Sequence, residues 1–374
     1  MKIVTLIICM SVLAAIAVLA VLIVVHELGH FMAARLQGIY ANRFSLGFGP
    51  ILWKYQGSQT EYAVRALPLG GFVGFPDEDP DSDIPLDDPN LLSNRPILDR
   101  AIVISAGVIA NLVFAYFLLV IQSGIVGIPD FINKPGVLIS EVAPQSSLVA
   151  QNAGIKAGDV ILAVNGQDLA LGKDGIVYLQ EKIQKSPNQS LNLKIQREEK
   201  TFDIALTPEL KNGNGMIGVS LNGNIEVIHS RADNILTAFN SAAKEYQRIT
   251  VLILQGFGKL ISNFQETANQ VSGPVAIIDI GAKIASSDPF SLFQFAALIS
   301  INLAIINILP LPALDGGQLA FLLIEAISGK PLPSGIQQNI MQTGLFLLLG
   351  LGIFLILRDT ANLLPASWME NFLQ

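Results

Sequence analysis

The stretch that decides the fold is the apolar run Ile3–Val25 followed by His26-Glu27-Leu28-Gly29-His30. The run contains 23 residues and no charge. At a helical rise of about 1.5 Å per residue, it is long enough to cross a hydrocarbon core of about 30 Å. Two imidazoles and a carboxylate at the end of a membrane span are costly unless they have partners. They are therefore candidate functional groups.

The spacing within this pentapeptide is typical of a metal-binding helix. Residues i and i+4 share one helical face, so His26 and His30 are placed to offer nitrogen ligands to one metal ion. Glu27 lies about 100° around the helix, where it reaches water beside a metal rather than the metal itself. Zinc lowers the pKa of bound water to about 7, and a carboxylate can accept the proton. The alternative is a chance match at a cytoplasmic helix end, and the motif alone does not decide.

Composition indicates a membrane protein. The 374 residues are 51% hydrophobic and 14% charged, with a mean hydropathy of +0.52, whereas soluble domains carry about 25% charged residues. The net charge of −7 argues against nucleic acid as a partner, because nucleic-acid binding needs clustered basic residues. The single cysteine, Cys9, allows no intrachain disulfide. We expect the lipid bilayer to surround much of the chain.

Four apolar segments predict four membrane-spanning helices, at residues 1–36, 101–128, 289–314 and 336–357. The first run exceeds the usual length of a signal-peptide core, so we expect an uncleaved span. Positive charges between the first two spans mark that loop as cytoplasmic; they are Arg43, Lys54, Arg65, Arg95 and Arg100. This topology places the HELGH segment near the cytoplasmic face and both termini outside.

The loop between the first two spans contains two strand-like segments, Ser45–Pro50 and Glu61–Val73, both punctuated by glycine and proline. Non-helical backbone at membrane depth is tolerated only where it is buried in protein or lines a cavity. We therefore expect a re-entrant β-segment that dips toward the active site. A small cytoplasmic β-element is the alternative. In the second span, Ser105-Ala106-Gly107 and Asn111 suit close helix packing, and Asn111 is also a candidate hydrogen-bond partner near the metal.

Residues 134–222 have a different character, with charges and alternating apolar residues but no segment that could span a membrane. Their strand, turn and helix pattern, above all Ala153–Gly166 (AGIKAGDVILAVNG), resembles a PDZ domain, an α+β fold. Gly215–Val219 resembles the carboxylate-binding loop of protease-associated PDZ domains, which implies a substrate contact at Gly218. Whether this extracytoplasmic domain receives a peptide C-terminus or only excludes bulky substrates stays open.

The region after the PDZ-like segment has helical periodicity and mixed charge over residues 231–266. It predicts amphipathic helices that lie on the outer membrane surface or support the PDZ-like domain. The expected organisation is therefore a membrane core in two parts with two inserted segments. The four parts are membrane core 1–128, PDZ domain 134–222, helical linker 223–288 and membrane core 289–374.

A third metal ligand is predicted at Asp315. A helix cannot run undisturbed through Pro310 and Pro312, so the backbone opens there and can direct the Asp315 side chain sideways. Asp315 is the only carboxylate residue between Asp288 and Glu325, and it lies at the cytoplasmic end of its span. Catalytic zinc sites use three protein ligands and keep one position open. The alternative is that Asp315 caps the following helix.

Together these motifs resemble the site-2 protease family of intramembrane zinc metalloproteases, in particular its single-PDZ bacterial and plastid branch. The resemblance rests on HELGH in the first span, on the intervening PDZ-like domain, and on N-x-x-P-x-P-x-L-D-G at residues 307–316. It implies His26, His30 and Asp315 as ligands of one Zn²⁺ per chain and Glu27 as the general base. The sequence departs from the family at Ala106-Gly107-Val108, where Ala-Gly-Pro is common.

The resemblance also implies substrate-binding residues. Asn307 is expected to hold the substrate or stabilise the developing oxyanion. The stretch 61–73 is expected to pair with an unwound substrate strand, with Leu69, Gly70 and Gly71 as the contacting residues.

The implied reaction is hydrolysis of peptide bonds in or near the transmembrane helices of single-span membrane proteins. Anti-sigma factors and remnant signal peptides are the usual substrates, after an upstream site-1 protease has trimmed them. The implied location is a bacterial plasma membrane or a plastid-type membrane. Two alternatives come from other classes. A membrane metal transporter needs several ligands along a path through the bilayer, which the predicted spans lack. An inactive PDZ-bearing adaptor would have lost Glu27 or a ligand, and all are present.

Overall fold

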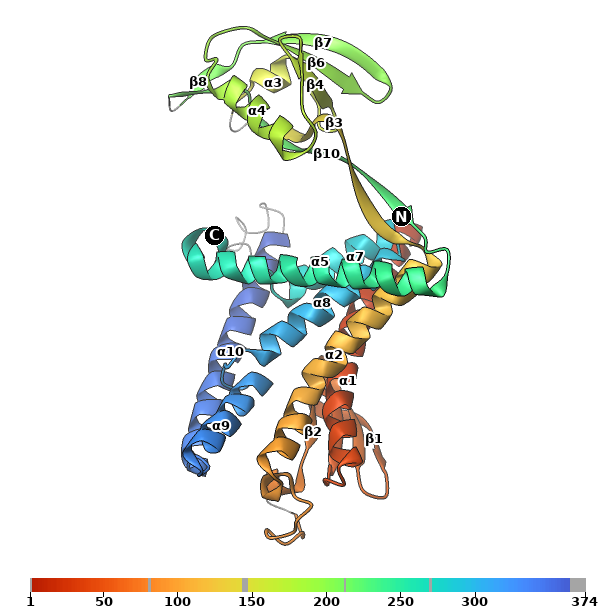
Figure 1. The fold of residues 1–374 in the computed structure, drawn as a ribbon, viewed down its shortest axis with the longest axis vertical. Helices are drawn as coiled ribbons and strands as arrows, with labels where there is room; N and C mark the ends of the chain where they lie inside the picture. The colour runs from red at the N-terminus through yellow and green to blue at the C-terminus, as the bar shows by residue number, and fades with distance from the viewer. Residues whose placement is uncertain (1, 80–81, 143–146, 212, 269–270, 364–374) are drawn as a thin grey trace. The chain divides into compact units, whose positions relative to one another are not determined.

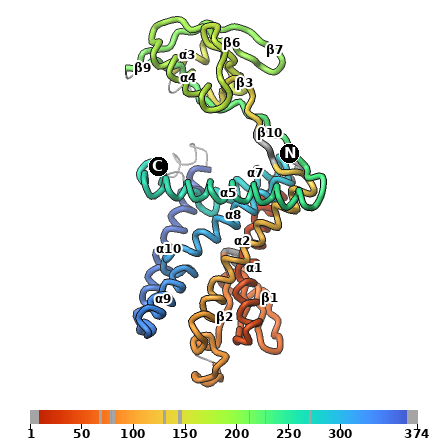
Figure 2. Tube along the Cα trace, in the orientation of Figure 1, coloured from red at the N-terminus to blue at the C-terminus, as the bar shows by residue number. Residues whose placement is uncertain are grey.

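The computed structural model describes residues 2–79, 82–142, 147–211, 213–268 and 271–363 (Figure 1). The chain divides into two compact units. One contains residues 1–128 and 231–374, and the other contains residues 129–230. Figure 2 traces the chain through both. The HELGH segment and Asp315 belong to the first unit, so the predicted metal site lies within a single unit.

Four helices of the first unit are long and apolar enough to cross a membrane. They are α1 (Lys2–Leu36), α2 (Ile97–Ile125), α8 (Ser291–Ile308) and α10 (Ser334–Leu363). The chain is therefore a multi-pass helical membrane protein, as predicted. The helix ends differ by a few residues from the sequence-based limits. In particular, α2 begins at Ile97 and α10 continues to Leu363.

Helices α1 and α2 approach closely at small residues. A Cβ on Gly29 would lie 2.4 Å from the carbonyl oxygen of Ala106. A Cβ on Gly107 would lie 2.2 Å from Nε2 of His30. The expectation that Ser105-Ala106-Gly107 suits close packing agrees with these contacts. Although Val108 replaces the family's common proline, α2 is continuous from Ile97 to Ile125, and Val108 is buried within it.

The segment expected to be a linker packs onto the spanning helices. Helix α5 (Ile235–Ser262) starts at a capping box between Asn234 and Thr237 and crosses α2 and α8 (Figure 1). Short α6 (Phe264–Thr267) follows, and then α7 (Pro274–Ser287) packs on α1. The three helices α2, α5 and α8 share one buried cluster, which consists of Ala115, Leu119, Ala242, Ile249, Ala297 and Ile301.

The loop after α1 forms a two-stranded sheet of β1 (Arg43–Gln56) and β2 (Glu61–Gly74). Both strands are longer than the segments predicted from the sequence. Their register shifts repeatedly, so Leu46 pairs with Gly71 and also with Val64, and Val64 pairs in turn with Trp53. The sheet is followed by the short 3-10 helices Pro76–Glu78 and Leu92–Asn94, which lead into α2.

The second unit is a mixed α and β structure. Its sheet has the order β10-β3-β4-β6-β7, and β5 pairs with β4. The strands are β3 (Ile128–Val142), β4 (Val160–Val164), β5 (Gln167–Asp168), β6 (Leu191–Arg197), β7 (Lys200–Leu206) and β10 (Val219–Ser230). A separate hairpin joins β8 (Glu209–Lys211) to β9 (Asn214–Met216), and the helices are α3 (Val149–Asn152) and α4 (Lys173–Gln184). Its core is aliphatic and includes Val137, Ile139, Ile161, Leu179, Leu193 and Ile195.

The limits of this unit differ from the expected range 134–222. Strand β3 begins at Ile128, and β10 continues to Ser230. The sheet therefore extends beyond both expected ends of the domain, and its edge strand β10 lies beside β3. The same unit contains an ion pair between Asp159 and Arg197. The buried carboxylate of Asp159 accepts hydrogen bonds from Nε and Nη2 of Arg197 at 2.7 and 2.8 Å.

Candidate metal centre

The metal centre is built from two helices that are distant in sequence. His26 and His30 lie one turn apart on α1, so their imidazoles project from the same face. Helix α8 ends at Ile308, before the two prolines, and α9 (Asp315–Ser328) begins at Asp315. The turn between them is tight, because a Cβ on Gly316 would lie 2.1 Å from the carbonyl oxygen of Leu309. This tight turn places Asp315, the first residue of α9, beside the two histidines of α1.

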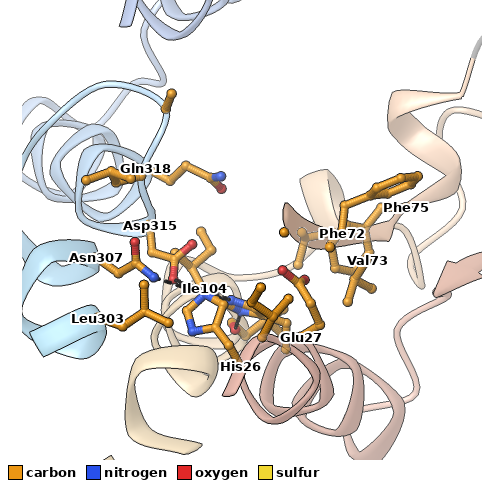
Figure 3. A pocket seen from close by; sticks show the side chains of 18 residues that line it. His26, Glu27, Phe72, Val73, Phe75, Ile104, Leu303, Asn307, Asp315 and Gln318 are labelled. Carbon is orange, nitrogen blue, oxygen red and sulfur yellow. Dashed lines mark hydrogen bonds and ion pairs between the residues drawn. The ribbon is translucent and has the colours of Figure 1, made fainter. Parts of the chain in front are cut away.

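Three side-chain atoms form a nearly equilateral triangle. Nε2 of His26 and Nε2 of His30 lie 3.3 Å apart, and Oδ2 of Asp315 lies 3.3 and 3.4 Å from them (Figure 3). All three side chains are largely shielded from solvent. Leu314, not Asp315, is the N-cap residue of α9, and Oδ2 of Asp315 is buried without a hydrogen-bond partner. The alternative interpretation of Asp315 as a helix cap is therefore wrong.

This triangle fits a zinc ion. Tetrahedral zinc with ligand bonds of 2.0–2.1 Å holds its ligand atoms about 3.3–3.4 Å apart, the separations observed here. The donor set of two imidazoles and one carboxylate matches a catalytic rather than a closed structural site. The orphaned Oδ2 of Asp315 would gain a partner from such an ion. Among the residues described, this is the group of histidine and carboxylate side chains able to hold a metal.

Helix α2 supplies an outer partner for each histidine. Nδ1 of His30 donates to the carbonyl oxygen of Val103 at 2.8 Å, which leaves Nε2 free as a ligand. Nδ1 of His26 lies 3.4 Å from the side-chain amide of Asn111, which is fully buried. A protonated Nδ1 needs an acceptor, so the amide orientation that presents Oδ1 to His26 is the chemically consistent one. The sequence allowed a role for Asn111 near the metal, and the structure places it against a specific histidine.

A cavity of about 500 Å³ adjoins the triangle, and several predicted site residues line it. Glu27, Gly70, Gly71 and Asn307 all line this space. Figure 3 shows Glu27 and Asn307 on different sides of His26. Gly71 lies against the predicted base, since a Cβ there would be 2.8 Å from Cγ of Glu27. Asn307, in the last turn of α8, places Nδ2 3.3 Å from Nε2 of His26.

The structure leaves two of the predicted substrate contacts untested. The side chain of Leu69 lies outside the described residues. Gly218 belongs to the second unit, where it adopts a φ of +77° and packs against the backbone of Ser147. Conversely, Ile104 and Gln318 line the cavity although no motif in the sequence includes them. The one available signal was position along the helix, because Ile104 follows Val103 in α2 and Gln318 lies one turn after Asp315 in α9.

Comparison with known proteins gives the family. The model of Peptidase family M50 matches residues 14–351. A relative from Nostoc sp. (strain PCC 7120), named "Putative zinc metalloprotease all3971", is 61% identical over 368 residues, which cover 98% of this chain and 100% of the relative. "Membrane metalloprotease ARASP, chloroplastic" from Arabidopsis thaliana is 49% identical over 356 residues, covering 94% and 79%.

A more distant relative is "Regulator of sigma-W protease RasP" from Bacillus subtilis, which is 29% identical over 399 residues and covers 86% of this chain and 91% of the relative. The family match includes both HELGH and the segment around Asp315. The chain belongs to peptidase family M50, the site-2 protease family, and is a zinc metalloprotease of the membrane.

Proposed function

We propose that His26, His30 and Asp315 hold one catalytic zinc ion and that Glu27 is the general base of peptide hydrolysis. The observation that carries this proposal is the triangle of ligand atoms, with sides of 3.3–3.4 Å, beside a cavity that Glu27 also lines. Zinc bound there supplies a Lewis acid that polarises a carbonyl group and makes water more acidic. The transporter and adaptor alternatives are set aside, because the family is a peptidase family and all four residues are present.

The residues of the chain then carry out the proton transfers. Glu27 accepts a proton from the attacking water as its oxygen bonds to the substrate carbonyl carbon. The same carboxyl group returns the proton to the leaving nitrogen as the C–N bond breaks, so the base ends unprotonated. The contact with Gly71 restricts the Glu27 side chain to the side of the cavity facing β2. The Nδ2 group of Asn307, 3.3 Å from His26, is positioned to donate to the developing oxyanion.

Substrate binding requires an extended strand. A transmembrane helix satisfies its own backbone hydrogen bonds, so its peptide groups are accessible only after local unwinding. Residues 70–73 of β2 line the cavity, and strand pairing with them would replace the lost hydrogen bonds. This supports β2 as the re-entrant substrate-binding segment.

The substrates proposed are single-span membrane proteins that an upstream site-1 protease has trimmed. The name of the Bacillus relative, a regulator of sigma-W, supports anti-sigma factors as one class, and remnant signal peptides are a second. The positive charges flanking α1 and α2 favour an active site near the cytoplasmic face. The relatives support a bacterial plasma membrane or a plastid-type membrane.

Residues 129–230 are proposed to form a PDZ-like extracytoplasmic domain that excludes untrimmed substrates. The sheet, the helix α4 and the buried aliphatic core support an independent folding unit. Deletion of this unit is expected to admit full-length single-span substrates, measured by cleavage of the same substrate with and without its extracytoplasmic domain. If the deletion variant still cleaves only the trimmed form, exclusion by size is wrong.

The decisive experiment compares two substitutions in purified protein. Glu27→Gln is expected to retain zinc, because Glu27 is not one of the proposed ligands. It is expected to lower the rate of cleavage of a single-span substrate by about 10²–10⁴-fold. Asp315→Ala is expected to lose zinc. Asp279→Asn, at a partly exposed site on α7, is the control and should match the wild type in both measurements. Normal cleavage by Glu27→Gln would remove it as the base, and unchanged zinc in Asp315→Ala would remove that residue from the ligand set.

A further inference from the structure

We propose that the ion pair between Arg100 of α2 and Glu325 of α9 is a positioning device that keeps Asp315 at the two histidines. The proposal rests on the proposed metal site and adds two residues that contact neither metal nor substrate. It explains how a carboxylate on a separate helix, almost 290 residues from HELGH, is held in ligand geometry.

The pair joins two helices at a shielded position. Nη2 of Arg100 bonds to Oε1 of Glu325, and each side chain is only 16% exposed. The residues are 225 positions apart, so the bond is a tertiary contact between α2 and α9. Removal of one partner would leave the other charge in a position with little water, which is the situation that makes such pairs important.

Both Arg100 and Glu325 lie at the end of their helix where the helix dipole disfavours their charge. Arg100 lies in the first turn of α2, which begins at Ile97, and Glu325 lies in the last turn of α9, which ends at Ser328. The helix macrodipole disfavours a cation at the first end and an anion at the second. Local helix stability therefore does not account for either residue, whereas the contact between the helices does.

Helix α2 is the common support of the whole site. Its Val103 carbonyl holds His30, its Asn111 faces His26, and its Arg100 holds α9. Arg100 and Asn111 are eleven residues apart, which is about three helical turns and returns to the same face. One face of α2 therefore contacts both histidines and also the helix that begins with Asp315.

Helix α9 needs such a support because it is not a continuation of α8. The chain between them turns at Pro310 and Pro312 and passes through a positive φ of 68° at Ala313. Glycines 316 and 317 pack tightly against this turn and fix the start of α9. Glu325 is ten residues further on, about 15 Å along the axis. A bond there prevents α9 from tilting about its start, a movement that would turn the Asp315 side chain away from the two histidines.

The experiment measures zinc affinity of the full-length protein by competition with a chromogenic chelator, together with thermal unfolding and cleavage of a single-span substrate. The double variant Arg100→Met/Glu325→Met removes the pair without leaving a lone charge, so its unfolding temperature should stay near the wild-type value. Its zinc affinity should fall about tenfold or more. The reversed pair Arg100→Glu/Glu325→Arg restores the bond and places both charges favourably for their helices. It should recover affinity to within about threefold of the wild type.

Lys283→Gln is the control, because it breaks an exposed ion pair within α7 alone and should leave zinc affinity unchanged. Wild-type zinc affinity in the double methionine variant would overturn the proposal. So would a folded reversed-pair variant whose affinity is no better than that of the double methionine variant. The Asp315→Ala variant distinguishes this result from an error in the ligand assignment. If Asp315 is not a ligand, this variant retains zinc even though Arg100 and Glu325 are unchanged.

Discussion

Replacement of Gly107 by alanine tests whether the close approach of α2 to His30 sets the metal geometry. A Cβ at this position would lie 2.2 Å from Nε2 of His30 and 2.7 Å from both adjacent ring carbons. Ordinary contact begins at 3.4 Å, so the ring or the helix would have to move by about 1.2 Å, the difference between these distances. Functional side chains need to stay within about 0.5 Å of their productive geometry. Zinc affinity is therefore expected to fall by about tenfold or more.

The expected effect on folding is much smaller. Alanine is favoured over glycine within a helix by about 1 kcal/mol. Overpacking of a close contact costs about 1–3 kcal/mol. The two effects oppose each other, so the free energy of unfolding should fall by only about 0–2 kcal/mol. A variant that unfolds near the wild-type temperature but binds zinc weakly would locate the effect at the site.

The assay is chelator competition on purified protein, with thermal unfolding and cleavage of a single-span substrate measured in parallel. Gly124→Ala is the matched control, because it changes a glycine in the same helix whose Cβ would meet nothing within 4 Å. It should bind zinc as the wild type does and unfold at the same or a slightly higher temperature. If Gly107→Ala also binds zinc and cleaves as the wild type does, the packing argument is refuted.

Three further predictions concern separate parts of the molecule. Gly71→Val should lower cleavage at least tenfold without loss of zinc, since its side chain would meet Glu27 and not the ligand triangle; equal loss of zinc would contradict this. Asn307→Ala should lower the single-turnover cleavage rate by about 10²–10³-fold, and a normal rate would exclude it as an oxyanion donor. In the second unit, burial favours a higher pKa for the Asp159 carboxyl group, but hydrogen bonds from Arg197 and the Lys156 N–H hold that pKa below its ordinary value of 3.8. This stabilisation is present above pH 3.8 and is lost as the pH falls through the lower folded-state pKa. The protection of amides from hydrogen exchange within residues 129–230, relative to the unfolded chain at the same pH, should therefore fall below about pH 4. Asp159→Asn should destabilise the unit by about 1.5–3 kcal/mol at pH 7, because it weakens hydrogen bonds to a charged group; unchanged exchange in this variant would contradict the assignment.

The membrane helices and the three proposed metal ligands could be predicted from the sequence because each prediction depends on a local pattern. A long uncharged run predicts a span whatever surrounds it, and an i, i+4 pair places two histidines on one face. Pro310 and Pro312 end a helix through their own backbone chemistry, which α8 confirms by ending at Ile308. These signals need no knowledge of tertiary contacts.

The limits of the inserted unit were less accessible. The expected range 134–222 followed the change in composition, whereas β3 and β10 continue beyond it to Ile128 and Ser230. Strand pairing, not composition, determines where such a sheet ends. For the same reason, the repeated register shifts of β1 and β2 could not be foreseen from two short apolar segments.

The sequence by itself determined the chemical groups: HELGH at the end of a span, a lone carboxylate after a broken helix, and a separate soluble-type segment between them. Only the tertiary structure decided how those groups are held. Asn111 faces His26 and Val103 holds His30 because glycine at 29 and 107 lets α1 and α2 come close together. Arg100 reaches Glu325 through the separate contact of α2 with α9. The close approach of α1 to α2 fixes the register between these helices, and interhelical register depends on packing between both surfaces rather than on either sequence segment alone.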